Sequence, residues 1–580
     1  MPTPPAPALA RPRRIVVVGG VAGGMSAAAR ARRLDESASI VVLEQSAHVS
    51  YAACGLPFHV SGEIEQRDAL LLHTPESLRA ALALDVRTGS RVTAIDRAAR
   101  TVTVEHADET YVLPYNALLL ATGATAVRPP VDGLDHPAVH ALRTVPDLDA
   151  LTGHLARLTP GHPRRAVVVG AGSIGLEAVE ALVARGLHVD LVELAGHVLP
   201  PLDAELAPLL ADELAGHGVG LHLGVSATSV TPDATPGTGT DGVVVTLSDG
   251  TRLPADLVVV SVGVRPASEL ARDAGLVLGA RGAIRVDADQ RTSDPHVWAV
   301  GDVVEVTHAV TGEVGPVPLA GPANRQGRRA ADAMLGRRTT PQAPVLGTAV
   351  VRVFGLTAAV TGASQAALRR AGIEHEVVRV HTGHHAGFYP GAEPVHLVAS
   401  FAPDGRLLGA QAVGREGVDK RIDVLATALR AGLGADDLAE LELAYAPPYG
   451  AAKDPVTMLG FVAQNALDGS LPQWHADDLD DVTATSLVLD VRSRAEHEAG
   501  HLDGALNVPH TEVRDRLDEV RDAAAGRPVA VHCASGVRSA LATRVLRAAG
   551  LDARNLSGGW LSLTTARPDV RPRPLARVGA

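Results

Sequence analysis

Short apolar runs that end in glycine-rich turns recur along the chain and predict parallel strands followed by helices. The first run covers residues 15–18; a glycine turn and an alanine-rich segment follow it, and a second run ends at Glu44. Residues 166–169 begin a second copy of this pattern, which ends at Glu193. A buried strand, a tight turn and a helix in this order are typical of a βαβ unit. The pattern therefore predicts two α/β units.

Both glycine turns have the spacing that holds a dinucleotide. Small residues let the backbone approach a pyrophosphate, the helix N-terminus faces the phosphates, and an acid at the end of the second strand accepts from ribose hydroxyls. In the second unit no arginine closely follows that acid, which favours NADH, with NADPH as the alternative. The candidate residues are Gly19, Ala22, Gly23, Gly24 and Glu44 in the first unit, where Val21 replaces the usual middle glycine, and Gly170, Gly172, Ser173, Ile174, Gly175 and Glu193 in the second.

Three later segments also show an apolar strand that ends in small residues. They are 118–130 with Ala121, Thr122 and Gly123, 258–270 with Gly263, and 297–306 with Asp302. Together with the two turns, these segments resemble the FAD-dependent pyridine nucleotide-disulfide oxidoreductase family. The resemblance implies FAD in the first unit, NADH or NADPH in the second, and Asp302 at the ribityl chain of FAD. It also implies an FAD domain that the NADH domain interrupts.

A lone cysteine, Cys54, lies in the segment VSYAACGLPFHVSG (49–62). One position departs from the related enzymes, because the family usually carries Asn where Ala53 stands. A thiolate that attacks a disulfide forms a mixed disulfide, which needs a second electron pair to resolve. This segment resembles the coenzyme A-disulfide reductase branch, as do PLAGPANRQGRRAA (318–331), HAGFYPGAEP (385–394) and YAPPYGAAKDP (445–455). The resemblance implies that reduced flavin supplies the electron pair and that coenzyme A is the resting partner of Cys54.

Two other functions remain open at Cys54. An NADH oxidase or peroxidase would cycle through a cysteine sulfenic acid, but those relatives carry His where this chain has Ala22. A redox-sensing or sulfur-trafficking protein would barely turn its flavin over. We therefore expect a reductase of coenzyme A disulfide, coenzyme A persulfide or polysulfide.

The resemblance further implies substrate contacts in the first unit. Arg30, Arg33 and Ser50 would line a channel for coenzyme A, whose phosphates are negatively charged. For the two arginines, a solvated helix face is the alternative.

Three of the six tyrosines fall in the two later motifs, as Tyr389, Tyr445 and Tyr449. A phenol can protonate a leaving thiolate, and Tyr445 is our first choice for this role. Packing is the alternative for each of the three. In the family such tyrosines reach the active site from the other subunit, which implies a homodimer.

The C-terminal part of the chain carries a second cysteine in a different pattern. A buried strand, residues 529–532, delivers Cys533 to a short loop that opens a helix, so backbone N–H groups and the helix dipole would stabilise an anionic persulfide. Four residues separate Cys533 from Arg538, whereas a low-pKa phosphatase loop would have five. The loop CASGVRS (533–539) and the segment LDVRS (489–493) resemble the rhodanese active site. We hypothesise that Cys533 accepts sulfane sulfur and passes it to coenzyme A or to Cys54.

Composition excludes several other classes of function. The net charge of −12 and the 2% of aromatic residues argue against nucleic acid, and the charge also argues against an anionic membrane. Two cysteines in 580 residues indicate a reducing compartment, and no apolar run is long enough to span a membrane. The opening residues lack the apolar core of a secretion signal. We expect a cytoplasmic enzyme with no bound metal.

The predicted fold class is α/β, with two Rossmann-like dinucleotide-binding domains, an α+β dimerisation domain and a C-terminal α/β rhodanese domain. The expected boundaries are 12–125 for the first part of the FAD domain, 126–254 for the NAD(P)H domain, 255–335 for the second part of the FAD domain, 336–466 for the dimerisation domain, 467–481 for a linker and 482–568 for the rhodanese domain.

Overall fold

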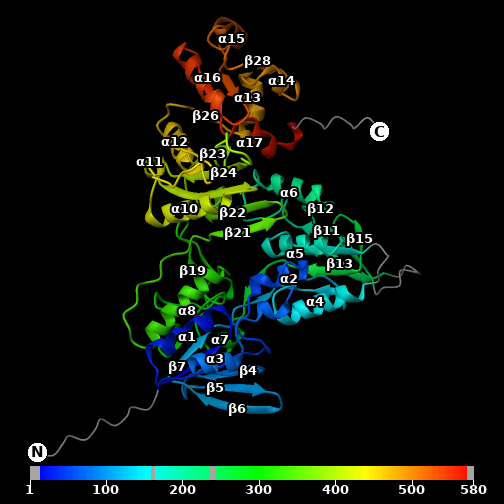
Figure 1. Cartoon of the computed structure of the whole chain (residues 1–580), viewed down its shortest axis with the longest axis vertical. Coiled ribbons are helices and arrows are strands. Elements are labelled where there is room, and N and C mark those ends of the chain that lie inside the picture. Colours follow the sequence, from blue (N-terminus) through cyan, green and yellow to red (C-terminus); the bar gives the residue numbers. More distant parts are fainter. Residues whose placement is uncertain (1–12, 159–163, 234–241, 571–580) are drawn as a thin grey trace, which may run out of the picture. The chain divides into compact units, whose positions relative to one another are not determined.

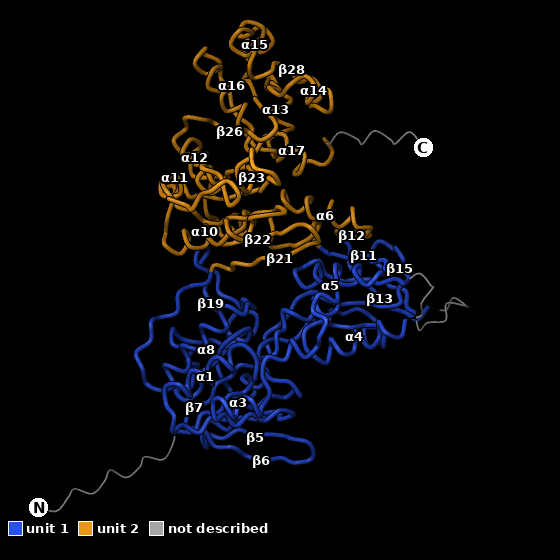
Figure 2. The backbone as a smooth tube through the Cα atoms, viewed as in Figure 1, with its two compact units in different colours: residues 1–194, 225–345 blue, residues 195–224, 346–580 orange. Residues whose placement is uncertain are grey.

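The computed structural model describes residues 13–158, 164–233 and 242–570 (Figure 1). The chain divides into two compact units (Figure 2). Unit 1 comprises residues 1–194 and 225–345, and unit 2 comprises residues 195–224 and 346–580. No helix in the described part of the chain is long and apolar enough to cross a membrane.

A five-stranded parallel sheet forms the centre of unit 1. Its order is β18-β7-β1-β2-β3, and its apolar strands are buried on both faces. Strand β18 pairs with β7 although the whole second dinucleotide unit lies between them in the sequence. The strands are β1 (Arg14–Val18), β2 (Ser39–Leu43), β3 (Asp85–Arg87), β7 (Ala117–Leu120) and β18 (Val297–Ala299).

Two helices and a small sheet cover the faces of this parallel sheet. Helices α1 (Ala22–Leu34) and α8 (Ala320–Met334) share one core cluster with it, and the antiparallel sheet β4-β5-β6 shares the other. A Cβ on Gly327 of α8 would lie 2.3 Å from the carbonyl oxygen of Gly23, so a glycine lets the two helices touch. The small sheet consists of β4 (Ser90–Asp96), β5 (Thr101–His106) and β6 (Glu109–Pro114).

A second parallel sheet in unit 1 follows the order β11-β10-β16-β9. The antiparallel sheet β13-β14-β15 shares a core cluster with it. The elements are α4 (Val145–Arg157), α5 (Ser173–Ala184), β9 (Val139–His140), β10 (Arg165–Val169), β11 (His188–Glu193), β13 (Ala227–Pro232), β14 (Val243–Leu247), β15 (Arg252–Ala255) and β16 (Leu257–Val260). Shorter elements of unit 1 are η1 (Ala53–Gly55), α2 (Leu56–Ser61), η2 (Arg67–Leu70), α3 (Pro75–Leu82), β8 (Ala124–Ala126), β17 (Val264–Pro266), α7 (Glu269–Asp273), η3 (Ala280–Gly282), β19 (Val306–Thr307) and β20 (Val314–Gly315).

Unit 2 contains a five-stranded antiparallel sheet of order β21-β22-β25-β24-β23. Helices α10, α11 and α12 share a core cluster with this sheet. The elements are α6 (Ala207–Gly216), β12 (Gly220–Leu223), β21 (Ala349–Val353), β22 (Leu356–Gly362), α9 (Gln365–Arg370), β23 (Glu376–Gly383), β24 (Pro394–Phe401), β25 (Leu407–Gly414), α10 (Val418–Ala431), α11 (Ala435–Ala439) and α12 (Pro455–Leu467).

The last domain of unit 2 is a parallel sheet of order β26-β30-β29-β27-β28 with helices around it. The segment 467–481, expected as a linker, contains β26, η4 and the start of α13, and β26 pairs with β30. Its acidic residues serve as caps, since Asp478 accepts from the backbone N–H of His475. The elements are β26 (Gln473–Trp474), η4 (Ala476–Asp478), α13 (Leu479–Thr485), β27 (Leu487–Asp490), α14 (Arg494–Glu498), β28 (Leu506–Asn507), α15 (Leu517–Ala524), β29 (Val529–His532), α16 (Val537–Ala548), β30 (Ala553–Leu556), α17 (Gly559–Ala566) and η5 (Pro568–Val570).

The predicted fold class is confirmed. Two parallel sheets of the dinucleotide-binding type, one antiparallel sheet with helices and one further parallel sheet follow one another as the sequence pattern indicates.

Candidate functional site

The two glycine turns of unit 1 repeat the same backbone geometry. Gly19 and Gly170 both have a φ of +104°, which an L side chain rarely adopts. A Cβ on Gly24 would lie 1.9 Å from the carbonyl oxygen of Gly19, and a Cβ on Gly175 would lie 1.9 Å from that of Gly170. Glycine is therefore required at the start of each turn and where each helix crosses it. Gly23, beside Gly24, is the contact with α8 described above.

Each predicted acid is held against its own turn. The backbone N–H of Gly20 donates to the Glu44 carboxylate (2.8 Å), and the N–H of Ala171 donates to the Glu193 carboxylate (2.7 Å). Both acids follow the carboxyl end of the neighbouring strand or lie in its last position. The repeated arrangement supports two dinucleotide sites of one design.

The helix N-termini leave room for phosphates. Val21 and Gly172 are the N-cap residues of α1 and α5, and neither helix has a side-chain cap. Ala22 is the first residue of α1, while Ser173 and Ile174 open α5 as exposed residues. A Cβ on Gly172 would meet nothing within 4 Å, so this turn borders open space. Uncapped N–H groups beside open space fit a pyrophosphate.

The predicted ribityl contact, Asp302, lies three residues beyond the end of β18 and directly follows Gly301, which has a φ of +84°. Its carboxylate pairs with Arg143 (Nη2 to Oδ2, 3.6 Å). Burial raises the pKa of Asp302, and Arg143 opposes that rise. Arg143 was not predicted, because it belongs to no recognisable sequence motif. The fold brings it to the sheet edge where Asp302 lies.

Small-residue turns complete the two sites. The backbone N–H of Ala121 donates to Val18 (2.7 Å), and the Thr122 hydroxyl donates to the carbonyl of Ala267 (2.7 Å). Gly123 and Gly263 have φ values of +68° and +99°. These residues shape the carboxyl edges of the two parallel sheets, and they fit FAD at the first sheet and NAD(P)H at the second.

Cys54 is an exposed free thiol in η1, at the start of α2. The segment before it is tied to the first glycine turn, because the N–H of Ser50 donates to the carbonyl of Gly20 (2.8 Å). Ser50 has a φ of +51°, an uncommon conformation for serine that this contact holds. On the other side, Arg185 at the end of α5 donates to the carbonyl of Val60 in α2. The thiol segment therefore bridges the two dinucleotide units.

The two arginines expected to meet coenzyme A differ in their surroundings. Arg30 donates two hydrogen bonds to Asp332 of α8 (2.8 and 3.2 Å) and so holds the helix pair together. Arg33 is exposed one turn further along α1. A phosphate contact stays a prediction for both, and at Arg30 it would compete with Asp332.

The three predicted tyrosines lie on one surface of unit 2. Tyr389, Tyr445 and Tyr449 are all exposed. Their two motifs are joined by the N–H of Ala386, which donates to the carbonyl of Gly450 (2.9 Å). Below them, the buried Arg421 and Asp454 form an ion pair (2.7 Å), and Arg421 also donates to the carbonyl of His384. We call residues 384–390 and 445–450 the tyrosine surface. At this exposure none of the three side chains is packed in the core of this protomer.

Cys533 lies at the end of β29 and is almost fully buried. Its Sγ accepts from the Ser539 hydroxyl (3.3 Å), and Gly536 turns the loop with a φ of +93°. Helix α17 is hydrogen-bonded to the loop, because the N–H of Trp560 donates to the carbonyl of Cys533 (2.7 Å). The predicted loop between strand and helix is therefore formed.

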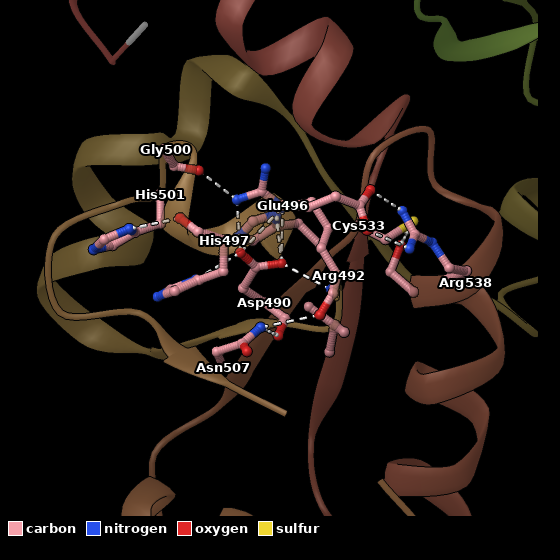
Figure 3. A network of polar contacts seen from close by, with 12 residues as sticks. Asp490, Arg492, Glu496, His497, Gly500, His501, Asn507, Cys533 and Arg538 are labelled. Carbon is pink, nitrogen blue, oxygen red and sulfur yellow. Dashed lines mark hydrogen bonds and ion pairs between the residues drawn. The ribbon is translucent and has the colours of Figure 1, made fainter. Parts of the chain in front are cut away.

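Two arginine–carboxylate pairs surround this loop (Figure 3). Arg538 donates to both oxygens of Glu496 (2.8 and 2.6 Å), and the pKa of Glu496 falls to about 2 chiefly because of these bonds. Burial opposes ionisation of Asp490, but hydrogen bonds from Arg492 outweigh it and lower its pKa. Glu496 was missed in the sequence, although its capping-box spacing from Ser493 is visible there.

Comparison with known proteins decides the family. The profile described as pyridine nucleotide-disulphide oxidoreductase matches residues 13–327, and that of its dimerisation domain matches residues 348–455. The chain belongs to the pyridine nucleotide-disulphide oxidoreductase family. The profile of the rhodanese-like domain matches residues 471–566, which includes β26. Membership implies an FAD-dependent and NAD(P)H-dependent enzyme.

Two relatives of known structure match nearly the whole chain, and a curated relative matches 78% of it. A coenzyme A disulfide reductase of Staphylococcus haemolyticus is 34% identical over 456 residues, which are 78% of this chain and 100% of that protein. The crystal structure of reduced Bacillus anthracis CoADR-RHD has 40% identity and a TM-score of 0.92, and the match covers 96% of this chain and 99% of that one. A NAD-dependent persulfide reductase from A. fulgidus has 36% identity and a TM-score of 0.88, with 95% and 99% covered. The resemblance to coenzyme A-disulfide and persulfide reductases with a C-terminal rhodanese domain is confirmed.

Proposed function

We propose that this oxidoreductase uses NADH to reduce coenzyme A disulfide, coenzyme A persulfide or polysulfide at Cys54. The observation that carries the proposal is the exposed, unpaired thiol on a segment tied to the FAD-type turn by Ser50 and to the NADH-type helix by Arg185. The chain's other cysteine, Cys533, belongs to the rhodanese fold. Cys54 therefore has to form its mixed disulfide with a substrate.

The chemistry at Cys54 follows from a single sulfur. The Cys54 thiolate attacks one sulfur of R–S–S–R, the substrate S–S bond breaks, and one R–SH leaves with a proton. FAD, when bound at the first glycine turn, supplies the electron pair that cleaves the mixed disulfide. The balanced reaction consumes one NADH and one proton and gives two R–SH, or one R–SH and H₂S from a persulfide.

The electron donor is NADH rather than NADPH in this proposal. Glu193 lies at the end of β11 and accepts from the N–H of Ala171, which holds its carboxylate at the turn where the ribose would bind. A negative group at this position repels a 2′-phosphate.

A homodimer supports the reaction in this proposal. The match to the family's dimerisation domain and the exposed tyrosine surface both favour it. A tyrosine from the partner subunit, first of all Tyr445, protonates the leaving thiolate at Cys54. The proposal keeps the domain boundaries given above. It also includes a cytoplasmic, reducing location, which the two free thiols fit.

The rhodanese domain delivers sulfur in this proposal. Cys533 accepts sulfane sulfur as a persulfide and passes it to coenzyme A or to Cys54, where reduction releases sulfide. Changing Cys533 to Ser should lower sulfide release from a persulfide donor while reduction of coenzyme A disulfide continues. Unchanged sulfide release in that variant would remove the relay.

The central test compares wild type with Cys54→Ser. Wild type should oxidise NADH only with a disulfide or persulfide substrate, and Cys54→Ser should lose at least about a thousandfold in kcat, the scale of removing a catalytic nucleophile. FAD absorbance should be equal in both proteins. Rapid NADH consumption with oxygen alone would instead favour the oxidase.

A further inference from the structure

The cations around the rhodanese cysteine are already neutralised by carboxylates of the same domain. Both terminal nitrogens of Arg538 donate to Glu496, and Figure 3 shows this guanidinium beside the Cys533 sulfur. Arg492 is buried and donates to Asp490 and to the carbonyl of Gly500 (2.7 Å). Residues 533–537 contribute no further cationic side chain. The loop therefore presents paired charges to an incoming sulfur donor.

Inorganic and organic sulfur donors need different surroundings when they react. The Cys533 thiolate attacks the outer sulfur of the donor, a new S–S bond forms, and the donor S–S bond breaks with no oxidant or reductant consumed. From thiosulfate the leaving group is sulfite, a dianion whose departure free cationic donors would assist beyond what the loop N–H groups supply. From an organic persulfide, R–S–SH, the leaving thiolate takes up one proton and departs as R–SH. Paired arginines suit the second donor.

A second, independent feature at the same loop points to an organic donor. Val537 and Leu541 lie one turn apart on α16 and are 56% and 55% exposed. Leu561, also exposed, opens α17 with its N–H bonded to the carbonyl of Ala534 in the loop (3.0 Å). These exposed aliphatic side chains lie on the two helices that adjoin the loop, so they can pack against the carbon body of R and offer nothing to thiosulfate.

We propose that Glu496 is the specificity-determining residue of the rhodanese site: by binding Arg538 it reserves Cys533 for organic persulfides and excludes thiosulfate. This inference rests on the sulfur-accepting part of the proposed function and names its donor class. Glu496 also caps α14 by accepting from the N–H of Ser493 (3.0 Å). Glutamine keeps that acceptor at the third helical position, so Glu496→Gln removes the charge and preserves the cap.

The test measures sulfur loading of Cys533 in the full-length protein without NADH, by the mass of the Cys533 peptide over time. The two donors are thiosulfate and N-acetylcysteamine persulfide, which has an uncharged organic body. Wild type should load from the persulfide and hardly from thiosulfate. Glu496→Gln should raise the thiosulfate rate about tenfold or more, the scale of one charge-assisted hydrogen bond. Glu512→Gln, which breaks the pairs with Arg494 and Arg516 in the same domain, is the matched control and should change neither rate.

Two outcomes would overturn the proposal. If wild type loads equally fast from both donors, thiosulfate is not excluded. If folded Glu496→Gln loads from thiosulfate at the wild-type rate, Glu496 does not determine the specificity. If Glu496→Gln does not fold, Leu541→Ser decides, because it should slow loading from the organic donor severalfold and leave the thiosulfate rate unchanged. Because the loading assay contains no NADH, it does not depend on reduction at Cys54. Its result can therefore be interpreted even if the reductase proposal fails.

Discussion

Two glycines of the second turn, Gly172 and Gly175, are needed for different reasons, the first for cofactor binding and the second for folding. Gly172 has a φ of −74°, which alanine adopts easily, and its Cβ would meet only open space. Gly175 has no such room, because its Cβ would meet the carbonyl oxygen of Gly170. The sequence motif does not distinguish the two glycines, but the fold tolerates a side chain only at Gly172.

We expect Gly172→Ala and Gly175→Ala to give different defects. Gly172→Ala should keep the unfolding midpoint and raise KM for NADH about tenfold, because its methyl group occupies the space a pyrophosphate needs. Gly175→Ala should destabilise the protein by about 1–3 kcal/mol through overpacking. Steady-state kinetics and urea unfolding distinguish them; equal stability loss in both variants would contradict the role given to Gly172.

Residues that a local pattern defines were predictable, and residues that only the fold brings together were not. Gly19, Glu44 and their counterparts follow from strand–turn–helix spacing within one βαβ unit. Arg143 and Asp332 carry no local signal, because each meets its partner across a long stretch of sequence. The segment 467–481 looked like a linker because Asp, Gly and Pro favour loops, although the same residues also cap short helices.

At the scale of elements, the tyrosine surface depends on a buried ion pair beneath it. Arg421 of α10 and Asp454, the N-cap of α12, join two helices and the 384–390 segment. Asp454→Asn should lower stability by about 3–5 kcal/mol, because it leaves the Arg421 charge buried without its partner. Asp404→Asn, at the exposed pair with Arg406, is the control and should leave the urea midpoint unchanged, because an exposed ion pair contributes little to stability. Equal urea midpoints in the two variants would contradict this account.

Strand β23 contacts the rhodanese domain through His381, one of two half-buried histidines that touch each other. His381 contacts His396 (2.8 Å) and the Ser562 hydroxyl of α17 (2.7 Å). Burial lowers the pKa of His381 to about 3, so the folded protein holds it neutral, whereas the unfolded chain binds a proton below about pH 6.5. Stability should therefore be full above that pH and should fall as the pH drops from about 6.5 towards 3.

The pH dependence can be measured by thermal unfolding of wild type and His381→Gln between pH 7.5 and 4.5. Wild type should lose up to about 1.4 kcal/mol per pH unit through this histidine, and His381→Gln should show a shallower slope. Parallel slopes for wild type and His381→Gln would show that His381 is not held neutral.

At the scale of the whole molecule, one chain carries two free cysteines in different settings. Cys54 is exposed on a segment between two dinucleotide units, and Cys533 is buried in a loop of paired charges. The order of domains was readable from the sequence, because each domain carries its own motifs. The pairing of Arg538 with Glu496 beside Cys533 became visible only in the structure.

The most direct test of the central claim is the mass of the Cys54 peptide from protein purified without reductant, before and after NADH. The account predicts one coenzyme A attached to Cys54 through a disulfide, and its release by one equivalent of NADH. A Cys54 that instead carries an oxygen atom, or an adduct that persists after NADH has been consumed, would contradict it.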